Sequence, residues 1–320
     1  MYQTHFGLRQ RPFPAMPDPA CYYPATSHER ALARLLDGLA DEEGVMLLTG
    51  GPGTGKTLLC HALIERLGRE VRTAFLTNSH LGDRAALLQA LLYDLALPYE
   101  KRGEQEMRLA LTDYLLQGYA EGRGTVLVVD EAQHLTPDLL EELRLLGNLE
   151  ARSAKAVQVV LVGQTALLET LRRPELAALA QRLAVRAELQ PLALQEAADY
   201  LLHQVRIAGG RPERLFADEA LELLSRQTRG IPRLLNQAAH QALNLAAEAG
   251  AAEVDAEAAL EALALLGLAE AIEDVGPSPL REEIIEDEPS AGESGELSGE
   301  SSAEVEETPC RLLLASGQSD

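Results

Sequence analysis

The sequence contains no tryptophan, and aromatic residues make up only 4% of its 320 positions. The core must therefore rest on leucine, alanine and valine, a composition that favours helices. No run of about 18 apolar residues occurs, so we expect no membrane-spanning helix. The first residues also lack the long apolar segment of a signal peptide. These absences favour a cytoplasmic protein.

Cysteine is scarce as well. The three cysteines, Cys21, Cys60 and Cys310, are odd in number and far apart, and no CxxC pair is present. This spacing argues against a disulfide framework or a zinc site, and it favours a reducing compartment. Cys60 is expected to be a small residue of the core.

Positive charge is in deficit. Lysine and arginine total 28 against 50 acidic residues, which gives a net charge of −22. Residues 268–320 hold 15 of the acids and 2 of the basic residues, so residues 1–267 carry about −9. Because nucleic acid is bound through clustered basic side chains, DNA is possible as a partner but disfavoured.

Four segments differ in pattern. Residues 1–27 are rich in proline and aromatic rings and predict an extended arm, because proline disrupts a regular helix. Residues 28–191 alternate apolar strands with helices, which predicts an α/β core with a parallel sheet covered on both faces. Residues 192–267 are helical throughout and predict a small helical lid domain. Residues 268–320, rich in Glu, Ser, Gly and Pro, predict a disordered acidic tail.

The hydrophobic periods give approximate bounds for each element. The expected strands are 45–49, 71–77, 125–129, 157–162 and 183–189. The expected helices are 28–39 with Ser27 as its cap, 56–67, 84–97, 106–119, 137–149 with Thr136 as its cap, 195–209, 218–228, 232–249 and 255–266.

A complete phosphate-binding loop follows the first expected strand and opens a helix, the context that this motif requires. It matches G-x-x-x-x-G-K-[ST] and consists of Gly50, Gly51, Pro52, Gly53, Thr54, Gly55, Lys56 and Thr57, with Leu58 next in the helix. Glycines let backbone N–H groups wrap phosphates, and the helix amino terminus adds positive charge. We expect Lys56 to reach the β- and γ-phosphates of ATP and the Thr57 hydroxyl to ligate Mg²⁺.

Two acids end the third expected strand, where ligands of open α/β sheets bind. Asp130 is placed to coordinate Mg²⁺, and Glu131 is placed to polarise the attacking water as a general base. Two solvated acids at a strand end are the plain alternative, which the neighbouring phosphate-binding loop disfavours. The sequence thus predicts an ATPase with ATP and Mg²⁺ as its ligands.

These motifs and the helical segment after them resemble AAA+ ATPases. More narrowly, the chain resembles the ATPase domain of general secretion pathway protein A, the ExeA-type family with its pilus-biogenesis relatives. The resemblance covers about residues 1–266 and rests on His5-Phe-Gly-Leu with Arg11-Pro-Phe, Pro17-Asp-Pro, Ser27-His-Glu with Ala31-Leu32, Gly53-Thr-Gly-Lys-Thr57, Asp130-Glu-Ala-Gln133, Leu161-Val-Gly-Gln164, Gln181-Arg182 and Gly230-Ile-Pro-Arg-Leu-Leu-Asn236.

The resemblance implies further roles. Gln164 is implied as the polar residue between the acids and the γ-phosphate, or else an ordinary polar group at a strand end. Arg182 is implied as the arginine finger that completes a neighbouring subunit's site, with Arg186 as the competing candidate and a surface arginine as the plain reading. Arg233 is implied as the lid arginine that senses the γ-phosphate. His28 either lines the adenine pocket or packs at a helix start.

Two functions follow from the resemblance as expectations. The first is an ATP-dependent oligomer that powers or regulates assembly of a secretion or pilus system, with a protein of that machinery as its partner. The second is regulation of a DNA transaction such as transposition. Full-length secretion members continue through a membrane segment, whereas this chain ends in an acidic tail, so we expect contact with the inner membrane only through a partner.

Overall fold

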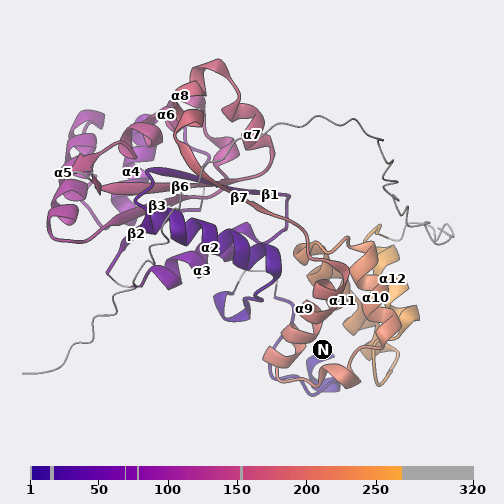
Figure 1. Cartoon of the computed structure of the whole chain (residues 1–320). Helices are drawn as coiled ribbons and strands as arrows, with labels where there is room; N and C mark the ends of the chain where they lie inside the picture. The colour runs from indigo at the N-terminus through magenta and orange to yellow at the C-terminus, as the bar shows by residue number, and fades with distance from the viewer. Residues whose placement is uncertain (1, 15–17, 69, 78, 152–153, 269–320) are drawn as a thin grey trace, which may run out of the picture. The chain divides into compact units, whose positions relative to one another are not determined.

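A single parallel sheet lies at the centre of the α/β part (Figure 1). The computed structural model describes residues 2–14, 18–68, 70–77, 79–151 and 154–268. The strands follow the order β2-β3-β6-β1-β7, with the bounds β1 Val45–Gly50, β2 Arg72–Leu76, β3 Thr125–Val129, β6 Val157–Gly163 and β7 Leu183–Leu189. β1 and β3 are buried along their whole length, as expected of strands that helices cover on both sides.

Helices cover the two faces of the sheet (Figure 1). On one face lie α2 Thr26–Ala40 and α3 Lys56–Leu67. On the other lie α4 Arg84–Asp94, α5 Glu104–Ala120, α6 Pro137–Leu146, α7 Ala166–Leu171 and α8 Ala177–Gln181. The predicted α/β class with a doubly covered parallel sheet is confirmed.

Four helices after the sheet form the second part of the fold, and they share one hydrophobic cluster. Their bounds are α9 Leu194–Ile207, α10 Asp218–Gln227, α11 Pro232–Glu248 and α12 Ala256–Leu265. The amino-terminal arm adds Tyr2, Leu8 and Phe13 to this cluster. Phe13 meets Phe216 edge to face at 6.4 Å between ring centroids. The rings of the arm therefore pack against the helical part.

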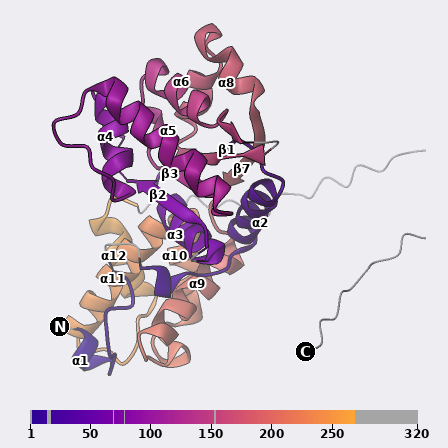
Figure 2. The same ribbon diagram turned by 90° about the vertical axis from the view of Figure 1, so that its left-hand side faces the viewer.

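Several local expectations were wrong. The arm begins with a short helix, α1 Tyr2–His5, which contacts α11 (Figure 2). Helix α2 starts at Thr26 with Ala25 at its N-cap, and the Ser27 hydroxyl donates to the Gln190 carbonyl instead of capping. α7, α8 and the small hairpin of β4 Glu150–Ala151 and β5 Ala154–Lys155 were not predicted, because each is too short to show a hydrophobic period. The expected disordered tail lies outside the described residues.

Six helix ends were predicted too late, four of them by one or two residues and those of α4 and α6 by three. Helix α4 ends at Asp94, and Ala96 then adopts a left-handed conformation with φ 55°. Helix α6 ends at Leu146, before Gly147. A Cβ on Gly147 would lie 2.9 Å from the Gly44 carbonyl oxygen, so close backbone contact sets this end.

Gly230, which lies between α10 and α11, contacts Leu192 just after the end of β7. Its φ is +66°, and its carbonyl accepts from the Leu192 N–H at 2.9 Å. A Cβ here would fall 1.9 Å from the Leu192 carbonyl oxygen, so neither backbone has room for it. We expect Gly230→Ala to lower the free energy of unfolding by about 2–4 kcal/mol, through a positive φ and overpacking.

Chemical denaturation of both variants and the parent chain measures this effect, with Gly250→Ala as the matched control. Gly250 has a similar φ of +70°, and no described atom lies within 4 Å of its added Cβ. Gly250→Ala should therefore lower the free energy of unfolding only by the backbone strain, about 1 kcal/mol. Equal losses for the two variants would contradict the close contact at Gly230.

Candidate nucleotide-binding site

The phosphate-binding loop connects β1 to α3 at the carboxyl edge of the sheet. Gly53 and Gly55 have φ values of +78° and +97°, which favour glycine. A Cβ on Gly53 would lie 2.8 Å from Arg233 Cβ, and one on Gly55 would lie 3.1 Å from His28 Nε2. These glycines therefore permit both the turn and the close approach of neighbouring residues.

Lys56 is the first residue of α3, and its side chain is buried. Its Nζ donates to the carbonyl oxygens of Gly50 at 3.1 Å and Gly51 at 2.9 Å. Burial lowers the pKa of the amine; nearby Glu131 and Asp130 oppose this shift, while Arg233 adds to it. Two cations thus converge on one loop, which suits a polyanionic ligand.

Thr57 and Asp130 meet next to the loop. The Thr57 hydroxyl donates to Asp130 Oδ2 at 2.5 Å, and Asp130 Oδ1 accepts from the Glu131 N–H at 2.8 Å. Asp130 is only 2% exposed, and its carbonyl accepts from the Ser79 hydroxyl. A hydroxyl oxygen and a carboxylate side by side are hard ligands of the kind that Mg²⁺ prefers. Elsewhere in the described residues, no cluster of three metal-binding side chains occurs.

Glu131 follows β3 in a strained conformation. Its φ of 54° and ψ of 34° are left-handed, which is uncommon for a residue with a side chain. It precedes a short 3-10 helix, η2 Ala132–His134. The Gln133 amide donates to Glu131 Oε2, and His134 Nε2 lies 4.0 Å from the same oxygen. Strain of this kind persists where surrounding contacts fix it, often at functional sites.

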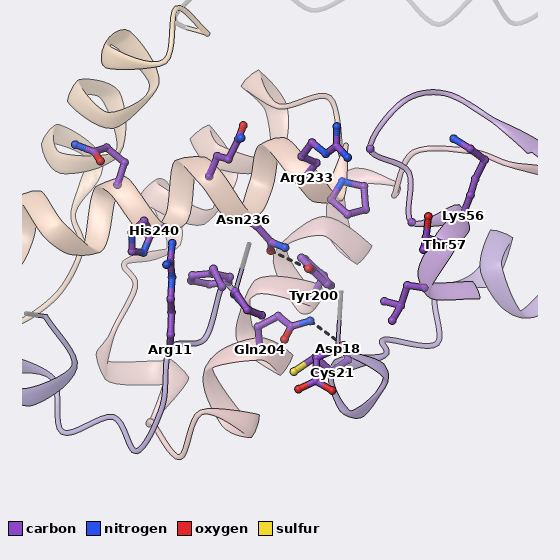
Figure 3. Close-up of a pocket in the computed structure, with 18 of the residues that line it drawn as sticks. Arg11, Asp18, Cys21, Lys56, Thr57, Tyr200, Gln204, Arg233, Asn236 and His240 are labelled. Carbon is purple, nitrogen blue, oxygen red and sulfur yellow. Dashed lines mark hydrogen bonds between the residues drawn. The ribbon is translucent and has the colours of Figure 1, made fainter. Parts of the chain in front are cut away.

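A cleft of about 570 Å³ joins the loop to the helical part and the arm (Figure 3). From the loop and strand ends come Gly53, Gly55, Lys56, Thr57, Leu58 and Glu131. From the arm come Arg11, Phe13, Pro14, Asp18 and Cys21, and from the helical part Tyr200, Gln204, Pro232, Arg233, Asn236, Gln237, His240, Gln241 and Leu266. The cleft therefore offers space beyond the phosphate-binding loop for the rest of a nucleotide.

Arg233 connects the helical part to the phosphate-binding loop. Pro232 is the first residue of α11, a position that suits its fixed φ and missing donor. The Arg233 N–H donates to the Gly53 carbonyl at 3.2 Å, and its side chain lines the cleft. The start of α11 and the phosphate-binding loop are thus in direct contact.

The other sequence-predicted residues lie around this centre. His28 is buried, its Nε2 lies 2.9 Å from the Thr54 carbonyl oxygen, and burial lowers its pKa. Gln164 follows β6, and its N–H donates to Gln133 Oε1 at 3.0 Å. Arg182 and Arg186 are exposed; Arg182 donates to Asn148 Oδ1 at 2.7 Å, and Arg186 donates to the Ala180 carbonyl at 3.2 Å. Neither arginine lines the cleft of its own chain.

Sequence reasoning missed two groups at this site. Gln133, which lies between Glu131 and Gln164, stands two residues after a general-base candidate and carries a polar side chain on a short turn. That placement was a weak signal. The arm residues Arg11 and Asp18 belong to stretches that carry the family resemblance, but nothing local indicates that they border a cleft beside α11.

Comparisons with known proteins agree with this geometry. A family model described as an AAA domain matches residues 39–171. General secretion pathway protein A of Aeromonas hydrophila is 42% identical over 244 residues, which cover 76% of this chain and 44% of that protein. The Holliday junction branch migration complex subunit RuvB of Kosmotoga olearia is 24% identical over 248 residues, 74% of this chain and 62% of that protein.

A solved structure shares the fold. The Aeropyrum pernix ORC2 protein, in its ADPNP–ADP complexes, matches with a TM-score of 0.59 at 17% identity, over 74% of this chain and 66% of that one. The chain spans less than half the length of General secretion pathway protein A. In the described part of the chain, no helix is long and apolar enough to cross a membrane. The chain has the P-loop fold of the AAA+ type with an AAA domain over residues 39–171, and it is similar to General secretion pathway protein A over three quarters of its own length.

Proposed function

We infer that the chain binds ATP with Mg²⁺ and hydrolyses it to ADP and phosphate. One observation carries this inference. Lys56, Thr57 and Glu131 line a single cleft together with glycines of the phosphate-binding loop, and buried Asp130 accepts a hydrogen bond from Thr57 beside it. Each of these groups has a distinct task in phosphoryl transfer to water. The ADPNP–ADP complexes of the structural relative support nucleotide as the ligand.

The side chains divide the work by position. Backbone N–H groups of Gly51 and of residues 53–57, together with the Lys56 amine, hold the phosphates. Thr57 and Asp130 would hold the Mg²⁺ that accompanies ATP, and the ion would supply charge neutralisation at the phosphates. Glu131 takes a proton from the attacking water, whose oxygen bonds to the γ-phosphorus as the bond to ADP breaks. Arg233 contacts the γ-phosphate from α11.

The remaining predicted residues complete the proposed site. The remaining loop residues set the shape of the phosphate-binding loop: Gly50, Gly51, Pro52, Thr54 and Leu58. His28 stabilises this loop through the contact of its Nε2 with the Thr54 carbonyl oxygen. Gln164 acts at the end of β6, beside the acids. The exposed Arg182 reaches a neighbouring subunit's cleft, since it does not line its own. This role requires a homo-oligomer, and Arg186 is the alternative finger.

The work done with ATP is assembly or regulation of a secretion or pilus system, through an ATP-dependent oligomer and a protein of that machinery. The 42% identity to General secretion pathway protein A supports this proposal. The alternative is regulation of a DNA transaction. The RuvB relative, named as a subunit of a Holliday junction branch migration complex, favours that alternative.

ATP turnover and light scattering on the same samples separate the two functions. The secretion proposal expects an ATP-dependent oligomer and turnover that duplex DNA leaves unchanged. Turnover stimulated several-fold by duplex DNA, with ATP-dependent loading of the protein onto it, would instead establish the DNA function.

Arg182→Ala tests the arginine finger. We expect turnover to fall about 10³-fold or more, as for other arginine fingers, while ATP binding persists. Mixing this variant with Glu131→Gln should restore activity, because one mixed interface combines an intact finger with an intact base. Arg186→Ala is the matched control. Loss of turnover in Arg186→Ala alone would reverse the assignment, and loss in neither would remove the finger from this segment.

A further inference from the structure

Gln133 forms a bridge between Glu131 and the end of β6. Its Nε2 donates to Glu131 Oε2, and its Oε1 accepts from the Gln164 N–H at 3.0 Å. The residue lies in η2, whose turn directs the side chain back toward the strand ends. One planar amide thus joins the carboxyl ends of β3 and β6.

Both partners fix which way the amide points. A backbone N–H can only donate, and an ionised carboxylate can only accept. The amide must therefore present its oxygen to Gln164 and its NH₂ to Glu131. Among side chains of this length, only glutamine offers an acceptor and a donor at these two places. Glutamate would present a second acceptor to Glu131, and methionine would fill the space without either hydrogen bond.

The space around the bridge is closed on one side by glycine. A Cβ on Gly163 would lie 2.8 Å from Gln133 Oε1 and 3.0 Å from Leu167 Cδ2. Gly163 is the last residue of β6 and is buried. The strand end therefore leaves room for the amide and for little else. The close contact with Gly163 therefore fixes the position of the Gln133 side chain relative to β6.

Glu131 needs such support because its own backbone is strained. A left-handed φ of 54° is less favourable than the ordinary helical region for a residue that carries a Cβ. The Gln133 and His134 contacts both fall on Oε2. The His134 ring, half-exposed, stacks on the His80 ring at 4.2 Å between centroids. Gln133 is the partner within hydrogen-bond distance, and it is anchored to the sheet.

We propose that Gln133 is the positioning residue for Glu131, which holds the carboxylate in one orientation and links it to the end of β6. This proposal rests on the proposed ATPase function, with Glu131 as the general base. A base displaced by about 1 Å loses on the order of 100-fold in rate, while substrate binding is unaffected. The bridge therefore acts on kcat and not on the affinity for ATP.

Two variants of nearly the same shape test the bridge in the full chain. Gln133→Met removes both hydrogen bonds and should lower kcat about 10- to 100-fold, with the Kd for MgATP within about threefold of the parent. Gln133→Glu keeps an acceptor for the Gln164 N–H but places a second carboxylate oxygen beside Glu131. Because the two negative charges repel, its kcat should be lower still. Gly163→Ala, which crowds the amide from the other side, should lower kcat in the same way.

Gln158→Met is the matched control. Gln158 also lies on β6, and its amide donates to the carbonyls of Leu39 at 3.0 Å and Glu43 at 3.2 Å, away from the acids. It should lose stability but keep kcat. The proposal is overturned if Gln133→Met keeps the parent kcat, or if Gln133→Glu is more active than Gln133→Met, because the Gln164 contact would then be the one that matters. Should Glu131→Gln itself keep full turnover, another group activates the water and the role given to Glu131 fails; absence of ATP turnover in the parent chain would instead overturn the proposed function.

Discussion

Glu131→Gln is expected to reduce ATP turnover by about 10²- to 10⁴-fold, the contribution of a well-placed general base. The amide cannot take a proton from the attacking water, yet it has nearly the same size as the carboxylate. Lys56, Thr57 and Asp130 remain in place, so ATP binding should persist. Phosphate release measured under saturating MgATP, beside equilibrium binding of a fluorescent ATP analogue, separates the two effects.

Glu141→Gln is the control for this substitution. Glu141 lies on α6, and its carboxylate pairs with Arg144 on the same helix at 2.7 Å. The Arg144 hydrogen bonds lower the pKa of Glu141, and this part-buried pair does not line the cleft. Turnover should be unchanged in this variant. Retained turnover in Glu131→Gln would show that another group activates the water.

Lys56→Ala is expected to weaken MgATP binding about 100-fold and to remove measurable turnover. Lys56 is a buried cation whose proposed ligand is a polyphosphate, and truncating one partner of such a pair typically removes 2–5 kcal/mol, or more than about 30-fold. The change also leaves the two carbonyl oxygens of Gly50 and Gly51 without their present donor. Titration calorimetry with MgATP and with MgADP measures the loss.

Arg66→Ala provides the matched control on the same helix. Arg66 is the basic residue in the last turn of α3, is half-exposed, and pairs with Glu29 at 3.2 Å. Exposed pairs of this kind contribute about 0–1 kcal/mol, so its removal should leave binding unchanged. Equal binding by Lys56→Ala and the parent chain would contradict the role given to the phosphate-binding loop.

The sequence was sufficient for the parts of the fold that repeat a strong local signal. Strand β3 was predicted with its observed bounds, because the β-favouring Thr125 and four consecutive apolar residues end at two acids. The phosphate-binding loop was predictable because glycine spacing, lysine and hydroxyl are all local to one turn. Both signals depend on neighbours in the chain, which is what sequence patterns record.

Contacts between distant segments were not predictable in the same way. The arm was expected to pack through its rings, but nothing in residues 1–27 indicates that Tyr2 would meet His240 at 3.0 Å or that Arg11 would border the cleft. The Gln133 bridge depends on the β3–β6 pairing and on a glycine 30 positions later in the chain. Such arrangements arise from the assembled sheet, so only the structure reveals them.

The most direct test of the ATP site is a calorimetric titration of the purified chain with MgATP under conditions that prevent turnover, in parallel with Lys56→Ala. We expect one nucleotide per chain, bound by the parent protein and about 100-fold more weakly by the variant. Absence of binding by the parent, or equal binding by both proteins, would contradict the assignment of this cleft to ATP.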